Sequence, residues 1–108
     1  MKICELLEIE DGAARAFHLS EQLEIFIVRQ GRHIFGYHNC CPHTGAPLNW
    51  LPEQFLDFSG DYIQCTGHDA MFRVEDGFCV SGPCHGQSLT PVQLIELDGD
   101  IIYRQSST

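Results

Sequence analysis

The amino-acid sequence predicts a small all-β fold, an antiparallel sandwich or barrel. Its 108 residues, 44% of them hydrophobic, suffice for one domain with a modest core. Short segments of β-branched and aromatic residues alternate with glycine and proline, which is typical of strands joined by tight turns. Two of the expected turns contain Asp-Gly, a pair that tolerates positive φ angles. We therefore expect residues 1–108 to form a single domain.

The first expected strand pair lies in the N-terminal third. Residues 25–28 (Ile-Phe-Ile-Val) form a short apolar run, typical of a strand buried on both faces, and Gln30-Gly31 is a turn signal. Residues 33–38 are then expected to be the partner strand. A helix over residues 20–30 is an alternative, but the β-branched residues favour a strand.

Two further hairpins are expected from the positions of the Asp-Gly pairs. One joins residues 72–74 to 78–80 through 75–77, and the other joins residues 94–97 to 101–103 through 98–100. Both have β-branched or aromatic residues on either side of the turn.

The charge balance excludes several classes of function. Six Lys and Arg against fifteen Asp and Glu give a net charge of -9, which repels nucleic acid and anionic membrane surfaces. The longest uncharged apolar run, residues 25–28, is too short to span a bilayer. Glu5 follows Met1 so closely that no signal peptide is expected. We expect a soluble, cytoplasmic protein.

Residues 40–69 fit the strand pattern poorly and contain the candidate metal ligands. They contain three prolines, the only tryptophan, and two short pieces with metal-ligand spacing, Cys41-Pro42-His43 and Cys65-Thr66-Gly67-His68. Each piece offers one thiolate and one imidazole, and 21 residues separate the two pieces. In a reducing compartment, cysteine beside histidine indicates metal or redox chemistry. The ligand set alone also fits structural zinc.

These pieces resemble the signature of Rieske [2Fe-2S] domains. Residues 41–48 (Cys-Pro-His-Thr-Gly-Ala-Pro-Leu) are similar to the family's first cluster loop, and Gly82-Pro83 falls at its proline loop. Phe72 and the turn ending at Gly77 also match family positions, and the match spans about residues 1–104. The resemblance implies one [2Fe-2S] cluster, with two Cys on one iron and two His on the other. The implied ligands are Cys41, His43, Cys65 and His68.

The resemblance also implies an architecture. It is an all-β Rieske-type sandwich or barrel with an inserted cluster-binding subdomain of two loops, at about residues 40–69, and a proline loop at about 81–87. Two features depart from the family pattern. The spacer is longer than usual, so residues 51–60 are expected to form an extra surface loop, and Asp69 stands where glycine is common.

The resemblance is to the soluble ferredoxin branch. Ala46 and Gly67 stand where high-potential relatives have the extra cysteines of a disulfide between the loops. Those relatives also have a Ser and a Tyr that donate hydrogen bonds to cluster sulfurs, at positions held here by Ala70 and Phe72. Without these donors, and with Asp69 nearby, we expect a reduction potential at the low end of the Rieske range, about -150 mV.

The implied function is one-electron transfer, in a protein that is not an enzyme by itself. The chain would take electrons from a flavin-dependent reductase and pass them to an oxygenase of the ring-hydroxylating dioxygenase type. Two alternatives remain open. One is an accessory subunit resembling the small subunit of assimilatory nitrite reductases, and the other is a Cys₂His₂ zinc-bound interaction module. Retention of all four ligands and the mixed Cys-His loops favour the carrier.

The remaining Cys and His residues are expected to have structural roles. Cys40 is expected to be a buried small apolar residue, and Cys4 and Cys79 are expected in the core. Cys84-His85 is rejected as a ligand pair because it lies inside the proline loop and lacks the spacing. Three histidines are expected to be surface or cross-strand residues: His18, His33 and His38. Trp50 and Phe55 are expected either to shield the cluster or simply to pack.

Overall fold

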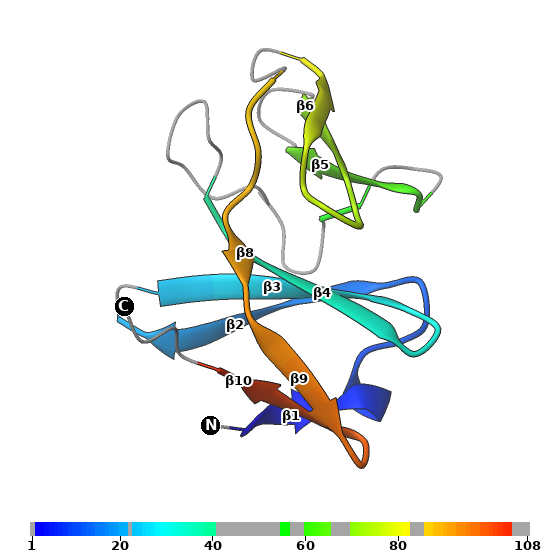
Figure 1. The fold of residues 1–108 in the computed structure, drawn as a ribbon, viewed down its shortest axis with the longest axis vertical. Coiled ribbons are helices and arrows are strands. Elements are labelled where there is room, and N and C mark those ends of the chain that lie inside the picture. The colour runs from blue at the N-terminus through cyan, green and yellow to red at the C-terminus, as the bar shows by residue number, and fades with distance from the viewer. Residues whose placement is uncertain are drawn as a thin grey trace.

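The chain forms three antiparallel sheets (Figure 1). The structure is a computed structural model that describes residues 2–21, 23–40, 55–56, 60–65, 70–82 and 86–104. The described residues contain no α-helix and a single 3₁₀ turn, η1. The elements are β1 (Lys2–Glu5), η1 (Leu6–Glu8), β2 (Ala14–Ser20), β3 (Leu23–Gln30), β4 (His33–His38), β5 (Tyr62–Cys65), β6 (Ala70–Arg73), β7 (Cys79–Ser81), β8 (Pro91–Val92), β9 (Leu94–Leu97) and β10 (Asp100–Tyr103). The predicted all-β fold is confirmed.

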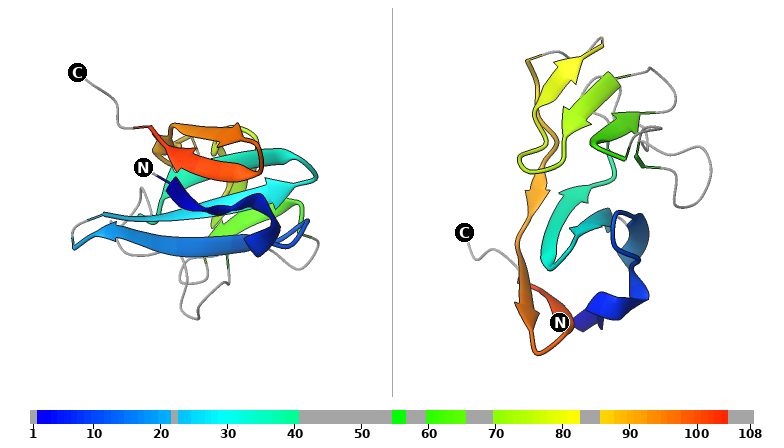
Figure 2. Two further views of the ribbon diagram at one scale, coloured as in Figure 1. Left: turned by 90° about the horizontal axis from the view of Figure 1, so that it is seen from below. Right: turned by 90° about the vertical axis from the view of Figure 1, so that its right-hand side faces the viewer.

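The four-stranded sheet β2-β3-β4-β8 lies between the other two sheets (Figure 2). One core joins it to the sheet β1-β10-β9, and a second core joins it to the sheet β5-β6-β7. The side chains of β3 alternate between these cores because successive residues of a strand point to opposite faces. Ile25 and Ile27 enter the first core, whereas Phe26 and Val28 enter the second, and all four have no exposed surface. The prediction of a strand buried on both faces is confirmed, and the helical alternative is wrong.

The predicted hairpins are present, with small shifts at their ends. The turn between β9 and β10 has positive φ at both Asp98 and Gly99, as the Asp-Gly pair predicts. The turn between β6 and β7 begins at Val74, because Asp76 accepts hydrogen bonds from the backbone of Phe78 and from Arg73. The Phe78 N–H and the Arg73 guanidinium hold the pKa of Asp76 below its ordinary value.

The outermost sheet brings the two ends of the described chain together. β1 pairs with β10, so that Lys2 lies opposite Ile102.

The described residues contain no helix that is both long enough and apolar enough to cross a bilayer.

Tyr37 on β4 links the middle sheet to the turn between β6 and β7. Its hydroxyl donates a hydrogen bond to the carbonyl oxygen of Val74 at 2.6 Å, and its ring is tilted against Phe26 at 5.8 Å between centroids. Gly77 has positive φ and packs so closely on the ring that a Cβ there would lie 2.8 Å from a ring carbon. Burial, with the negative charge of Asp76, raises the pKa of Tyr37 to about 12.

We expect Tyr37→Phe to lower the free energy of unfolding by about 1–3 kcal/mol, because the buried Val74 carbonyl loses its donor. Urea denaturation at neutral pH measures the difference. The raised pKa adds a signature at high pH. The phenol proton contributes stability that is complete below pH 10 and lost as the pH rises from about 10 to 12. The variant should lack this loss of stability at high pH. A variant whose free energy of unfolding equals that of the parent at both neutral and high pH would refute a stabilising role for the Tyr37–Val74 hydrogen bond.

Candidate metal centre

Cys65 is the last residue of β5 and lies at the end of the β5–β6 hairpin where the two strands are connected. It pairs with Ala70, the first residue of β6, and the four residues 66–69 connect the two strands. The buried face of this hairpin consists of Cys65, Ile63, Ala70 and Phe72, none more than 1% exposed. The Cys65 thiol therefore belongs to an apolar face, and in the sequence two residues separate Cys65 from His68. His68 itself lies outside the described residues.

The first predicted ligand loop follows the end of β4. The backbone N–H of His38 donates a hydrogen bond to the carbonyl oxygen of Thr90 at 2.9 Å. The backbone N–H of Asn39 donates to the carbonyl oxygen of Glu24, also at 2.9 Å. The strand is therefore held from both sides just before the chain enters residues 41–54. Cys41 and His43 lie in this segment, outside the described residues, and Cys65 is the predicted ligand that the structure describes.

Gly82, at the start of the predicted proline loop, packs closely against Ala70, the first residue of β6. Its φ is +100°, and a Cβ on this residue would lie 2.7 Å from the Cα of Ala70. Such an approach to backbone leaves no room for a side chain, which explains the glycine. Ala70 directly follows residues 66–69, so the chain returns to this place after β7. Residues 83–85 lie outside the described residues.

The other described cysteines separate into core and surface residues. Cys4 and Cys79 are 5% and 0% exposed, which confirms the prediction that they belong to the core. The prediction for Cys40 is wrong, because this residue is exposed. Asn39 occupies the inward position at the end of β4, so the next side chain points outward. Cys84 lies outside the described residues.

The three non-ligand histidines differ in exposure. His18 and His33 are exposed, and His38 is half-buried. His18 faces Glu24 across β2 and β3, which agrees with a cross-strand role.

Phe55 is a core residue that fixes the chain beside β5. It has no exposed surface and stacks on Phe26, with 4.5 Å between ring centroids and 12° between ring planes. Its carbonyl oxygen accepts a hydrogen bond from the backbone of Gln64 at 2.8 Å. Packing in the core therefore explains the burial of Phe55. Trp50 lies outside the described residues.

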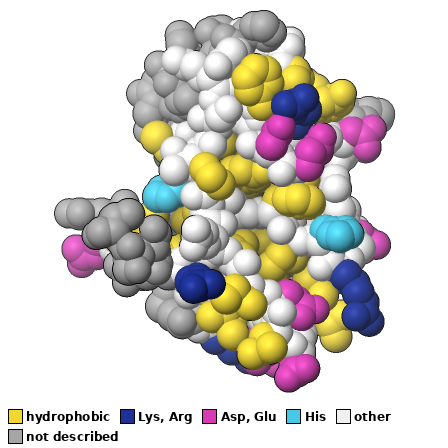
Figure 3. Space-filling view, viewed as in Figure 1, with side chains coloured by type: hydrophobic (Ala, Val, Ile, Leu, Met, Phe, Trp, Pro, Cys, Tyr) yellow, Lys and Arg dark blue, Asp and Glu magenta, His cyan; other side chains and the backbone are white. Residues whose placement is uncertain are grey.

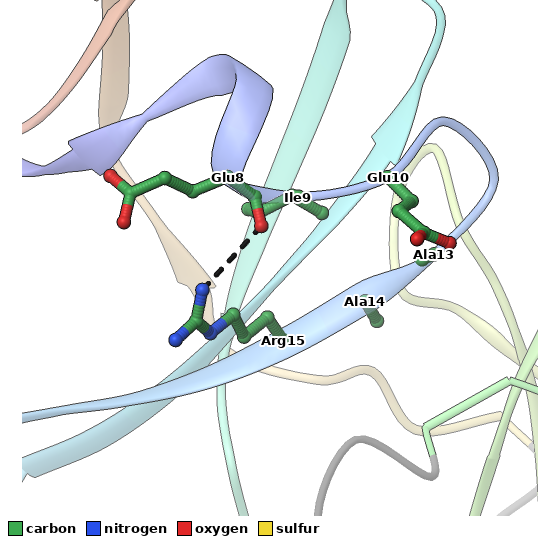
Figure 4. A pocket seen from close by; sticks show the side chains of 6 residues that line it. All are labelled: Glu8, Ile9, Glu10, Ala13, Ala14 and Arg15. Atoms are coloured by element: carbon green, nitrogen blue, oxygen red, sulfur yellow. Dashed lines mark hydrogen bonds between the residues drawn. The ribbon is translucent and has the colours of Figure 1, made fainter.

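A surface hollow of about 370 Å³ lies between η1 and β2, in the half of the molecule that carries β1 (Figure 4). Its lining includes Glu8, Glu10 and Arg15, and the Arg15 guanidinium donates to the carbonyl oxygen of Glu8 at 3.4 Å. The hollow is separate from the hairpin of Cys65. Within the described part of the chain, no group of three or more His, Cys, Asp or Glu side chains could hold a metal ion.

Comparison with known proteins assigns the fold. The family model of the Rieske [2Fe-2S] domain matches residues 1–96. The ferredoxin of carbazole 1,9a-dioxygenase from Nocardioides aromaticivorans IC177 superposes with a TM-score of 0.79 and 21% sequence identity, over 98% of this chain and 97% of that chain. The Sphingomonas yanoikuyae B1 ferredoxin gives 0.79 and 21%, over 98% of each chain. No curated protein matches the sequence significantly.

A chain from the complex of reduced oxygenase and oxidized ferredoxin in carbazole 1,9a-dioxygenase is also similar. Its TM-score is 0.76 and its sequence identity is 25%, over 94% of this chain and 88% of that chain.

The residues of this chain fit the cofactor of that family. A Rieske cluster takes two thiolates and two imidazoles, which are the donors that the two predicted ligand loops contain. Cys65 supplies a buried thiol on an apolar face, and Gly82 packs closely against Ala70 of the same hairpin. The mixed Cys-His loops and the family match favour this cluster over zinc. The chain belongs to the Rieske [2Fe-2S] domain family, and its cofactor is one [2Fe-2S] cluster.

Proposed function

We propose that this chain is a one-electron carrier in which Cys41, His43, Cys65 and His68 hold the cluster. In this proposal it passes electrons from a flavin-dependent reductase to an oxygenase of the ring-hydroxylating dioxygenase type. The observation that carries the proposal is the match over nearly the whole length of two ferredoxins, 97% and 98% of their chains. The complex of oxygenase and ferredoxin named above supports an oxygenase as the acceptor.

The described residues support the ligand assignment through the geometry of the β5–β6 hairpin. Cys65 would bind one iron as a thiolate from the end of β5, and His68 would bind the other from the connecting loop. Cys41 and His43 would complete the set from the segment after β4. When bound, the cluster accepts and returns one electron. The fully buried side chains of Ile63 and Phe72 would keep water away from the Cys65 thiolate.

This function needs no catalytic residue on the chain itself, and the oxygenation chemistry belongs to the acceptor. We propose that residues 1–108 act as one domain, with cluster loops at about 40–69 and a proline loop at about 81–87. We place the protein in the cytoplasm, where a reducing environment keeps cysteines available to iron. Nucleic acid and membranes are not proposed partners.

A spectroscopic experiment tests the carrier function. The purified protein should contain two iron and two sulfide per chain. Its visible spectrum should bleach on reduction, and the reduced form should give a Rieske-type EPR signal. Reduced protein should then transfer electrons to an oxygenase in stopped-flow mixing. A colourless protein with stoichiometric zinc would support the zinc module. A chain that binds neither metal would support the accessory-subunit alternative.

We expect electron transfer to the partner to slow as salt is added. Residues 39–90 contain six acidic residues and one basic residue, Arg73, which pairs with Asp76. Acidic side chains are spread over the face in Figure 3. Attraction to a basic patch is screened over about 8 Å at physiological salt. Stopped-flow rates at low and high ionic strength measure the effect, and reduction by a small neutral reductant is the control. A rate that does not change with salt would contradict steering by charge.

We expect Phe72→Tyr and Ala70→Ser each to raise the reduction potential by tens of millivolts. Both residues have no exposed surface and lie on the buried face that Cys65 shares. A hydroxyl placed there can donate to a cluster sulfur and stabilise the reduced state. The unmodified protein should lie near the low end of the Rieske range, about -150 mV. Protein-film voltammetry measures the three midpoints. A parent potential well above zero, or two unshifted variants, would contradict the argument.

A further inference from the structure

Glu24 on β3 connects two neighbouring strands through its carboxylate. One oxygen, Oε2, lies 2.6 Å from Nε2 of His18 on β2. The other oxygen, Oε1, accepts a hydrogen bond from the side-chain amide of Asn39, just after β4. The carbonyl oxygen of Glu24 also accepts a hydrogen bond from the backbone N–H of Asn39 at 2.9 Å. Glu24 therefore holds Asn39 through both its backbone and its side chain.

Asn39 is the buried polar residue of the described part of the chain, at 7% exposed. A buried amide group is stable only when it is hydrogen-bonded, so its contact with Glu24 fixes the side chain in place. The residue also marks the point where β4 ends. Two positions later the sequence reaches Cys41, the first proposed ligand.

A cavity borders Asn39 where the chain leaves β4. This cavity of about 340 Å³ lies between the β2–β3 hairpin and the end of β4, and its lining includes Glu21, Glu24, Asn39 and Cys40. The hydrogen bonds of Glu24 to Asn39 restrain the chain where it leaves β4 beside this cavity.

We propose that Glu24 and Asn39 are positioning residues for the first cluster loop. By fixing the backbone two residues before Cys41, they hold the loop in the arrangement that binds iron. Interactions that orient metal ligands in this way typically contribute 10- to 100-fold to metal affinity. This inference rests on the proposed ligand assignment.

The test compares how fast holoprotein variants lose their cluster. Visible absorption is followed in excess iron chelator for the parent and for Glu24→Ala and Asn39→Ala, and EPR spectra are recorded after reduction. We expect both variants to lose the cluster about 10- to 100-fold faster than the parent and to show altered EPR g values. The double variant should lose it no faster than either single variant, because the two residues act through each other.

Two further variants separate positioning from general destabilisation. Glu24→Gln keeps an acceptor oxygen for Asn39, so its loss rate should stay within about threefold of the parent. Glu21→Ala, which lines the same cavity, is the matched control and should behave as the parent. The proposal is overturned if Glu24→Ala and Asn39→Ala both lose the cluster at the rate of the parent. It is also overturned if they lose it faster but show unchanged EPR spectra, or if Glu24→Gln loses it as fast as Glu24→Ala. A parent that holds no [2Fe-2S] cluster refutes the proposed function instead.

Discussion

Replacing Cys65 by serine is expected to abolish the visible and EPR signals of the cluster. A serine hydroxyl is far less acidic than a cysteine thiol and is a poor substitute for a thiolate on iron. Because metal binding contributes to the stability of a folded metalloprotein, the variant should also unfold at a lower temperature than the holoprotein. Iron content, EPR and thermal denaturation measure these losses together. The same result is expected for Cys41→Ser.

Two other cysteines provide controls for this experiment. Cys40→Ser changes an exposed thiol next to a proposed ligand, and Cys79→Ser changes a buried thiol that donates to the carbonyl oxygen of Ser81 at 3.2 Å. Both variants should keep the spectrum of the parent, and so should Cys84→Ser. Loss of the cluster in Cys84→Ser, with retention in Cys65→Ser, would show that the ligand assignment is wrong.

Replacing Phe55 by alanine is expected to lower the free energy of unfolding by about 3–5 kcal/mol. The ring has no exposed surface and stacks on Phe26 across the core between the middle sheet and β5. Its removal leaves a cavity between these layers. Small domains have total stabilities of about 5–15 kcal/mol, so the loss is a large fraction of the whole. Urea denaturation of parent and variant in the same cofactor state gives the difference.

Leu7→Ala is the matched control for Phe55→Ala. Leu7 is 82% exposed, so its truncation should change the free energy of unfolding by less than about 0.5 kcal/mol. A loss below about 1 kcal/mol in Phe55→Ala would mean that the stack contributes little to the core. A comparable loss in both variants would point to a change in the unfolded state.

The elements that the sequence predicted well are those with strong local signals. The run Ile25 to Val28 has no polar residue on either face, which is typical of a strand between two cores, and all four residues are fully buried. The two Asp-Gly turns carry their own backbone preference, which is independent of the rest of the fold. The ligand loops were predicted from a resemblance, and the family match confirms the cofactor. The assignment of Cys41, His43, Cys65 and His68 as its ligands stays a prediction.

Other features depend on contacts between distant residues and have no local signal. The β1 strand, Lys-Ile-Cys-Glu, is too short and mixed to be recognised without β10. The exposure of Cys40 follows from the inward position of Asn39, which in turn depends on Glu24, 15 residues earlier. The prediction that Cys40 is buried considered only its apolar character, and it is therefore wrong. The contact between Glu24 and Asn39 is likewise visible only once the strands are paired.

The pairing of β1 with β10 has a consequence for the order of folding. Lys2 meets Ile102 only after almost the entire chain has been brought together. Such long-range closure is slow, and β-rich domains commonly need about milliseconds to seconds to fold. The β5–β6 hairpin connects residues that are close in sequence, and isolated hairpins form in about 1–10 μs. The hairpin that carries Cys65 can thus form long before the first strand finds its partner.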